Sequence, residues 1–247
     1  MKAIVLQEIK NIDSLKITEI PYPKPVAGTV IVKLHTAVLN HRDLWIIKGL
    51  YANIKVPVVL GSDGCGKVVE IGEEVKKKWK DRDVIINPAL NWGNDPAVQH
   101  QNFRILGMPD NGTQAEYVII PESNLFSKPP YLSFEEAAAL PLAGLTGYRA
   151  LFTQGCLQKG EKVLLTGIGG GVASLMLQMA VAIGSEVWVT SGDDHKIDQS
   201  MKKGAVGGVN YHHADWPMEL RSRLGTGRID LVVDSAGGNG FNDLIEI

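Results

Sequence analysis

The alternation of hydrophobic and polar positions changes character near the middle of the chain. Up to residue 127, short apolar runs separated by Pro and Gly are typical of β-strands; they lie at 3–6, 15–19, 29–36, 66–71, 83–87 and 115–120. After residue 131, apolar runs alternate with segments of helical period; these runs lie at 163–166, 186–190, 209–211 and 229–234. Alternating strands and helices predict a parallel sheet with helices on both faces. The pattern therefore predicts an α/β plus β protein, with a β-rich domain at residues 1–127 and a doubly wound domain at 128–247.

The helices are predicted from apolar spacing together with their start and stop signals. Residues 41–48 form the single helical segment expected in the first domain. Ser133 and Glu136 have the spacing of a capping box, and we expect Pro141 to interrupt the helix that they begin. A second helix is expected over 145–153. The remaining expectations are helices at 172–183, 195–203 and 216–224, and a long surface loop at 88–109.

The predicted parallel sheet is shorter than a full dinucleotide-binding sheet. Such a sheet has the strand order 3-2-1-4-5-6, and the pattern supplies candidates only for strands one to four. Phe241, Leu244 and Ile245 have helical spacing, but no further strand follows them before Ile247. We therefore expect an incomplete doubly wound sheet without strands five and six, as in a fragment or truncated form of a longer protein.

Composition excludes several classes of function. The net charge is −2, and the Lys76–Lys80 cluster resembles a solvated turn more than a nucleic-acid surface. With only Cys65 and Cys156, neither a disulfide framework nor a four-cysteine zinc site can form. No apolar run approaches the length of a membrane span. We expect a cytoplasmic protein that acts on a small molecule, with neither nucleic acid nor membrane as a partner.

The strongest chemical signal is a glycine cluster between the strand at 163–166 and the helix that follows. Gly167, Gly169, Gly170 and Gly171 precede Val172, and apolar residues then recur at helical spacing to Ile183. A strand, tight turn and helix in this order bring backbone N–H groups to a helix N-terminus, where a phosphate can bind. Glycine is also required in tight turns for steric reasons alone, so the cluster by itself leaves both interpretations open.

Motifs along the whole chain resemble the medium-chain dehydrogenase/reductase superfamily, on its zinc-independent quinone oxidoreductase-like branch. They are Leu39-Asn40-His41-Arg42-Asp43, Gly49-Leu50-Tyr51, Gly61-Ser62-Asp63-Gly64-Cys65-Gly66, Gly112-Thr113-Gln114-Ala115-Glu116-Tyr117-Val118, Leu145-Thr146-Gly147-Tyr148, Val209-Asn210-Tyr211 and Val233-Asp234-Ser235-Ala236-Gly237-Gly238, together with the glycine cluster. The resemblance implies a GroES-like β-barrel domain, a Rossmann domain, hydride transfer from a nicotinamide cofactor, and a homodimer for the full-length form.

The chain departs from the zinc alcohol dehydrogenases of this superfamily at the ligand positions. Where those enzymes have a Cys, a His-Glu pair and a second Cys, this chain has Asn40, Ser62-Asp63 and, near the third position, Leu142. A catalytic zinc needs three protein ligands and an open position, which this set does not supply. We therefore expect no metal. Without a Lewis acid, a quinone or an α,β-unsaturated carbonyl is the favoured hydride acceptor, because conjugation spreads the developing charge.

By resemblance, three residues line the nicotinamide and substrate cleft: Asn40, Tyr51 and Thr146. Asn40 can donate a hydrogen bond to a carbonyl oxygen, and Tyr51 can orient substrate or relay a proton. Tyr51 can equally be a half-buried aromatic that packs under a loop. Asp43 is expected to hold its loop through hydrogen bonds, as Asx residues do at turns.

The cofactor is expected to be NADPH, with NADH as the alternative. An NAD enzyme places a carboxylate at the end of the second strand, where this chain has Ser191-Gly192. In the branch that it resembles, residues placed like Lys196 and Tyr211 hold a 2′-phosphate, whereas Asp193 and Asp194 would repel one. Besides these residues and the glycine cluster through Val172, Thr146 and Ser235 complete the expected cofactor site.

Two other functions remain open from the sequence. A chain without strands five and six can be a catalytically dead nucleotide-binding protein, because these strands normally complete the nicotinamide side. An alcohol dehydrogenase-like enzyme is the other alternative, although its zinc ligands are missing.

Overall fold

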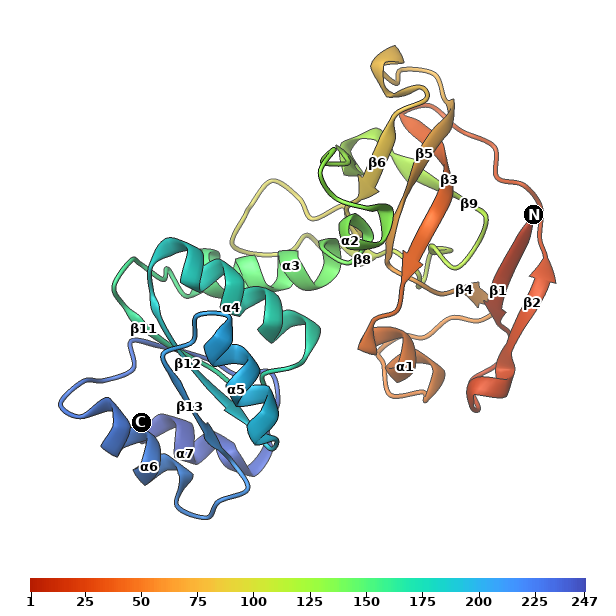
Figure 1. The fold of residues 1–247 in the computed structure, drawn as a ribbon. Coiled ribbons are helices and arrows are strands. Elements are labelled where there is room, and N and C mark those ends of the chain that lie inside the picture. Colours follow the sequence, from red (N-terminus) through yellow and green to blue (C-terminus); the bar gives the residue numbers. More distant parts are fainter. The chain divides into compact units, whose positions relative to one another are not determined.

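The computed structural model describes residues 1–238 and 240–247 with their side chains. The chain divides into two compact units, Met1–Leu142 and Ala143–Ile247 (Figure 1). The domain boundary expected at residue 127 stays a prediction. In the structure, the helix that follows this point packs on strands of the first unit.

The first unit is built from short antiparallel strands. They are β1 (Lys2–Leu6), β2 (Leu15–Glu19), β3 (Thr29–Val38), β4 (Val58–Val59), β5 (Asp63–Ile71), β6 (Asp83–Ile86), β7 (Ala89–Leu90), β8 (Arg104–Ile105), β9 (Tyr117–Pro121) and β10 (Leu125–Ser127). One sheet has the order β10-β6-β5-β3-β9, a second has the order β2-β1-β4, and β7 pairs with β8. Short 3-10 helices lie at Ile12–Ser14, Lys77–Trp79 and Glu122–Asn124.

The core of this unit follows from the two-residue period of its strands. Val30 and Val32 of β3, Val118 and Ile120 of β9, and Val68 of β5 all face one apolar cluster. A second cluster lies under helix α1 (His41–Ile47), whose Ile46 and Ile47 pack with β1 and β4. These contacts fix the loops at both ends of α1, where the candidate residues of this unit lie.

Helix α2 (Phe134–Ala138) packs against β3, β5 and β6. It begins with the expected capping box: the Glu136 N–H donates to Ser133 Oγ at 3.1 Å, and the Ser133 N–H donates to Glu136 Oε2 at 2.9 Å. Helix α3 (Pro141–Tyr148) then starts at Pro141, so the expectation that its helix starts at residue 145 is wrong. Proline is well suited to a first helical turn, because the N–H that it lacks would have no partner there. A π-helical segment, Arg149–Gln154, continues from α3.

The second unit contains a four-stranded parallel sheet with helices between the strands. Its elements are β11 (Lys162–Leu165), α4 (Gly171–Ile183), β12 (Glu186–Ser191), α5 (Asp194–Lys202), β13 (Gly207–Asn210), α6 (Trp216–Leu224), β14 (Leu231–Val233), the 3-10 helix Gly238–Gly240 and α7 (Phe241–Ile245). The strand order is β13-β12-β11-β14, which is the predicted order 3-2-1-4.

Alternate residues of β11 face opposite sides of this sheet and bury both of its faces. Val163 and Leu165 pack with α4 and with Ile197 of α5. Leu164, on the other face, packs with Trp216 and Leu220 of α6. Because both faces are covered, residues 163–165 form a continuous apolar run, which is typical of a strand in a parallel sheet.

The very short strands were not predicted. β4 and the β7–β8 pair contain two residues per strand, which is too few to show a period. The loop expected over 88–109 therefore carries a small hairpin. None of the helices within the described residues combines the length and apolar character that a bilayer span requires.

Candidate functional site

The glycine turn between β11 and α4 has the backbone conformation that a phosphate cradle requires. Gly167 and Gly169 have φ angles of +62° and +107°, a region that side chains rarely adopt. Ile168, between them, is buried, and its N–H donates to the carbonyl oxygen of Thr190 at 2.8 Å. The turn is therefore anchored to the end of β12 and exposes its glycines. Gly170 is the N-cap of the 13-residue helix α4, and no side chain caps that helix.

The space around the turn fits a cofactor pyrophosphate. A Cβ added to Gly167 would meet no atom within 4 Å, and the nearest atom to one on Gly170 would lie 3.7 Å away. The first N–H groups of α4 begin at Gly171 and Val172, where the helix dipole favours an anion. A cavity of about 500 Å³ adjoins the turn; it is lined by Thr166, Gly167, Thr190, Tyr211, Asp234 and Gly237, among others.

Asp234, just after β14, closes one side of this cavity. Its carboxylate accepts hydrogen bonds from the Thr166 hydroxyl and from the N–H groups of Ala236 and Gly237. Burial by itself would raise the pKa of Asp234, but these hydrogen bonds outweigh burial and lower it. The predicted cofactor residue Ser235 is exposed within the same turn.

The end of β12 carries no carboxylate of its own. Ser191 is 3% exposed, and its hydroxyl accepts a hydrogen bond from the Asp193 N–H at 3.1 Å. Asp193 is the N-cap of α5, where its side chain accepts from the His195 N–H. The first of the two acidic residues is therefore used to start a helix.

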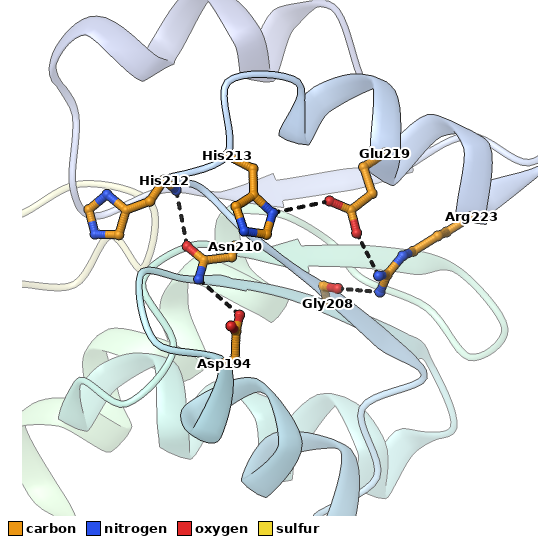
Figure 2. Close-up of polar contacts among 7 residues, drawn as sticks. All are labelled: Asp194, Gly208, Asn210, His212, His213, Glu219 and Arg223. Carbon is orange, nitrogen blue, oxygen red and sulfur yellow. Dashed lines mark hydrogen bonds and ion pairs between the residues drawn. The ribbon is translucent and has the colours of Figure 1, made fainter.

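The second acidic residue is held by strand β13. The Asn210 amide donates to Asp194 Oδ1 at 2.9 Å, and Asn210 Oδ1 in turn accepts from the His212 N–H (Figure 2). Neighbouring contacts fix α6 to the same strand, because Glu219 pairs with Arg223, whose guanidinium donates to the Gly208 carbonyl oxygen. Asp194 thus faces a neutral amide.

Three groups that suit an anion lie close to the glycine turn and to Gly192. A Cβ on Gly169 would lie 2.8 Å from Cδ of Lys196, so the Lys196 stem crosses the turn. A Cβ on Gly192 would lie 2.5 Å from the His212 ring and 2.9 Å from the Tyr211 hydroxyl. The structure therefore brings the predicted residues Lys196, Gly192 and Tyr211 to one edge of the sheet. The ring of His212 lies there too.

In the first unit, the positions that hold zinc ligands in the zinc alcohol dehydrogenases come together around one carboxylate. Asn40 Nδ2 donates to Asp63 Oδ2 at 3.0 Å, and the Leu142 N–H donates to Asp63 Oδ1 at 2.9 Å. Ser62 Oγ donates to the Leu106 carbonyl oxygen at 2.8 Å. An amide, a carboxylate and a leucine therefore occupy this place, which is a hydrogen-bond network and a poor donor set for zinc.

Asp63 is 1% exposed, and burial outweighs the hydrogen bonds from Asn40 and Leu142, which lower its pKa, so that the pKa is raised to about 6. Asp43 lies nearby and adds to the increase. Asp43 accepts from the Asn40 N–H at 2.9 Å and from the Gly61 N–H at 3.2 Å, so it holds two loops together as expected. Two buried acids therefore support Asn40, one through its backbone and one through its amide.

Arg42 is a functional candidate that sequence reasoning missed. The side chain is 8% exposed, and its N–H groups donate to five oxygens: the Tyr51 hydroxyl, Ser62 Oγ and the carbonyls of Leu106, Ile105 and Met108. Its guanidinium also lies 5.0 Å from the Tyr51 ring centre. The ring of Tyr51 is half-buried and packs against the apolar cluster under α1, as in the alternative in which Tyr51 is a packing residue. Its hydroxyl accepts a hydrogen bond from Arg42. No periodicity could have revealed this, because a buried arginine and an exposed one look alike in sequence.

The predicted site residues fall into two groups. Asn40 and Tyr51 belong to the first unit, and Thr146 lies on the second unit's part of α3, where it is exposed. Their roles stay predictions. Among the described residues, no cluster of three or more His, Cys, Asp or Glu side chains is placed to hold a metal ion.

Families of known proteins match a part of each of the two units. The family described as alcohol dehydrogenase GroES-like domain matches residues 26–130, and the family described as zinc-binding dehydrogenase matches residues 171–247. The zinc-type alcohol dehydrogenase-like protein YogA of Leptosphaeria maculans is 36% identical, over 91% of this chain and 67% of its own length.

Solved structures have the same fold. A structure titled as an NAD-dependent alcohol dehydrogenase is 37% identical, with a TM-score of 0.93, and covers 100% of this chain and 74% of its own. The quinone oxidoreductase from Coxiella burnetii is 28% identical, with a TM-score of 0.83, and covers 100% of this chain and 72% of its own. The fold is that of an NAD(P)-dependent oxidoreductase. The chain belongs to the medium-chain dehydrogenase/reductase superfamily, with a GroES-like unit followed by a Rossmann-like unit.

Proposed function

We propose that this protein transfers hydride from NADPH to a quinone or an α,β-unsaturated carbonyl without zinc. The observation that carries the proposal is the Asn40–Asp63–Leu142 network, which occupies the place of a zinc ligand set. A simple ketone is harder to reduce without a Lewis acid, since charge builds up on one oxygen. A conjugated acceptor spreads that charge, so a hydrogen bond can stabilise it.

The chain's own residues have separate tasks in this reaction. When bound, the nicotinamide supplies the hydride. The glycine turn and the start of α4 bind the pyrophosphate, and Asn40 donates an amide N–H to the substrate carbonyl oxygen. The Arg42 guanidinium holds the Tyr51 hydroxyl in one direction, from which it can orient substrate.

The proposed preference for NADPH is supported by the charges at the end of β12. Both nearby carboxylates have other partners, since Asp193 caps α5 and Asp194 accepts from Asn210. The Lys196 stem already crosses the glycine turn, and its ammonium is a suitable partner for a 2′-phosphate.

We expect Lys196→Ala to weaken NADPH binding about 10- to 100-fold, because one charge-assisted contact of roughly 1.5–3 kcal/mol is lost. NADH binding should change little, since NADH lacks the 2′-phosphate. Fluorescence titration of wild type and variant with both cofactors measures this. Lys202→Ala, at the exposed end of the same helix, is the matched control. Tighter binding of NADH than NADPH by the wild type would refute the preference.

The relatives support different substrates. The Coxiella protein is titled a quinone oxidoreductase, in agreement with the proposal, whereas the 37% identical structure is titled an NAD-dependent alcohol dehydrogenase. The alcohol dehydrogenase-like reaction is therefore the second candidate.

The test is oxidation of NADPH and NADH by the wild-type chain with a panel of benzoquinones, naphthoquinones and enones. The reverse direction is followed with primary and secondary alcohols, with and without added zinc. We expect turnover of the conjugated acceptors, unaffected by a zinc chelator. Alcohol oxidation that depends on stoichiometric zinc would replace this proposal with the second candidate. Cofactor binding without turnover of any substrate would favour a nucleotide-binding role.

A further inference from the structure

The buried carboxylate of Asp63 determines which end of the Asn40 amide faces it. Asp63 Oδ1 accepts from the Leu142 backbone N–H at 2.9 Å. That partner can only donate, so Oδ1 stays an acceptor whatever the charge of Asp63. Asp63 Oδ2 faces the Asn40 amide at 3.0 Å. The polarity of this second hydrogen bond is therefore the one feature of the pair that can change.

An ionised carboxylate has no proton to donate, so it requires an N–H from Asn40. The amide nitrogen has two N–H groups, and the second remains for another acceptor beside Asp63. A carboxyl protonated on Oδ2 would donate instead and would require the Asn40 carbonyl oxygen in the same place. The amide would then have to turn by half a rotation.

We propose that Asp63 is a positioning residue, which in its ionised form directs an N–H of Asn40 toward the substrate carbonyl and in its protonated form turns the amide away. This inference rests on the proposed function, because it assigns Asn40 as the donor to the substrate. Asp63 is 1% exposed and does not need to touch the substrate to act.

The surroundings of Asp63 determine the pH at which its carboxylate takes up a proton. Burial is the largest effect on the pKa of Asp63; together with the carboxylate of Asp43 on α1, and against the hydrogen bonds from Asn40 and Leu142, it raises this pKa to about 6. Arg42, on the same helix, has its five N–H groups on neutral oxygens of Tyr51, Ser62 and the 105–108 loop. A raised acid pKa means that the proton is taken up as pH falls through about 6. The N–H donor is thus available above this pH and is lost below it.

The first test is the pH profile of quinone reduction by the wild type and by Asp63→Asn. We expect wild-type kcat to fall below about pH 6. In Asp63→Asn, kcat should be roughly 10- to 100-fold lower, since one donor to the developing charge is misdirected. The fall of kcat at low pH, which is the acid limb of the profile, should be absent from Asp63→Asn, because the titrating group is gone. The KM for NADPH should change less than about twofold, because Asp63 lies outside the cofactor turn.

Two further variants separate positioning from a structural role. Asp43→Asn removes a buried acid that holds only backbone N–H groups, so it should lower thermal stability and keep the acid limb. The exchanged pair Asn40→Asp with Asp63→Asn also places a donor against an acceptor, as Asp63→Asn does once the Asn40 amide has turned. It should therefore keep the thermal stability of Asp63→Asn, without recovering kcat.

The second test does not depend on turnover. In ¹⁵N-labelled wild type, the side-chain NH₂ signals of Asn40, assigned by their loss in Asn40→Ala, should shift with a midpoint near pH 6. They should be unchanged by pH in Asp63→Asn. If no acceptor is reduced by the wild type, the proposed function fails while these signals still decide the role of Asp63. Signals that ignore pH, or an acid limb retained in Asp63→Asn, would overturn the inference.

Discussion

Replacing Arg42 with methionine should lower the free energy of unfolding by about 3–5 kcal/mol, which is the range for breaking a buried polar or charged network. Methionine fills much of the same volume, but it removes a donor from five oxygens, three of them backbone carbonyls at residues 105, 106 and 108; the Leu106 carbonyl keeps the Ser62 hydroxyl as a donor. Buried oxygens without a donor lose their hydration without compensation. The loop that these carbonyls belong to, and the direction of the Tyr51 hydroxyl, should be lost first.

Urea unfolding of Arg42→Met and Arg42→Lys measures this effect. Lysine cannot reproduce the fork of five donors, so it should recover only a small part of the loss. The matched control is Arg104→Met, since Arg104 lies in the same loop but is 41% exposed and pairs with Asp110. An exposed pair contributes about 0–1 kcal/mol. Equal losses in Arg42→Met and Arg104→Met would contradict the assignment of Arg42 as the anchor of the loop.

Replacing Gly170 with aspartate should abolish most NADPH binding while leaving the fold as stable as before, or more so. Gly170 has φ −72° and ψ 155°, which any residue can adopt, and the nearest atom to an added Cβ is 3.7 Å away. Aspartate is a better N-cap than glycine, and it is favoured by the helix dipole, so α4 should gain up to about 1 kcal/mol. The new carboxylate would lie where the pyrophosphate binds. Repulsion of several kcal/mol at short range should weaken NADPH binding at least about 100-fold.

Thermal unfolding and fluorescence titration of the same preparation test this pair of opposite effects. Gly170→Ser is the control, because serine also caps a helix but carries no charge, and we expect it to weaken binding far less than aspartate. A variant Gly170→Asp that binds NADPH like the wild type would show that the phosphates bind elsewhere. A loss of stability in both variants would show that Gly170 is required for steric reasons.

Most of the fold could be predicted because its signals are local. Strand period, the capping box at Ser133 and the glycine turn at 167–171 each depend on a few consecutive residues, and all three are present in the structure. The strand order 3-2-1-4 also followed, since alternating strands and helices leave few ways to build a parallel sheet. The start of α3 at Pro141 was missed because proline both ends helices and begins them.

The chemistry within the first unit could not be predicted in the same way. The sequence showed that Asn40, Asp63 and Leu142 occupy positions where zinc enzymes of this superfamily have ligands. It did not show that Asn40 and Leu142 donate to the two oxygens of Asp63. Leu142 is 79 residues from Asp63, and Met108 is 66 residues from Arg42. Contacts over such distances depend on how β3, β5 and α1 pack, which no local pattern records.

The sequence by itself determined the order of the parallel strands and the place of the glycine turn, because periodicity and glycine placement constrain the backbone directly, and its motifs gave the superfamily by resemblance. Only the tertiary structure decided the environment of each polar side chain. Burial raises the pKa of Asp63 and encloses the guanidinium of Arg42 among five oxygens, and at the surface Asp194 accepts a hydrogen bond from Asn210 of the neighbouring strand. Burial and hydrogen-bond partners arise from segments far apart in the chain, and they set the charge and direction of the groups on which the proposed reaction depends.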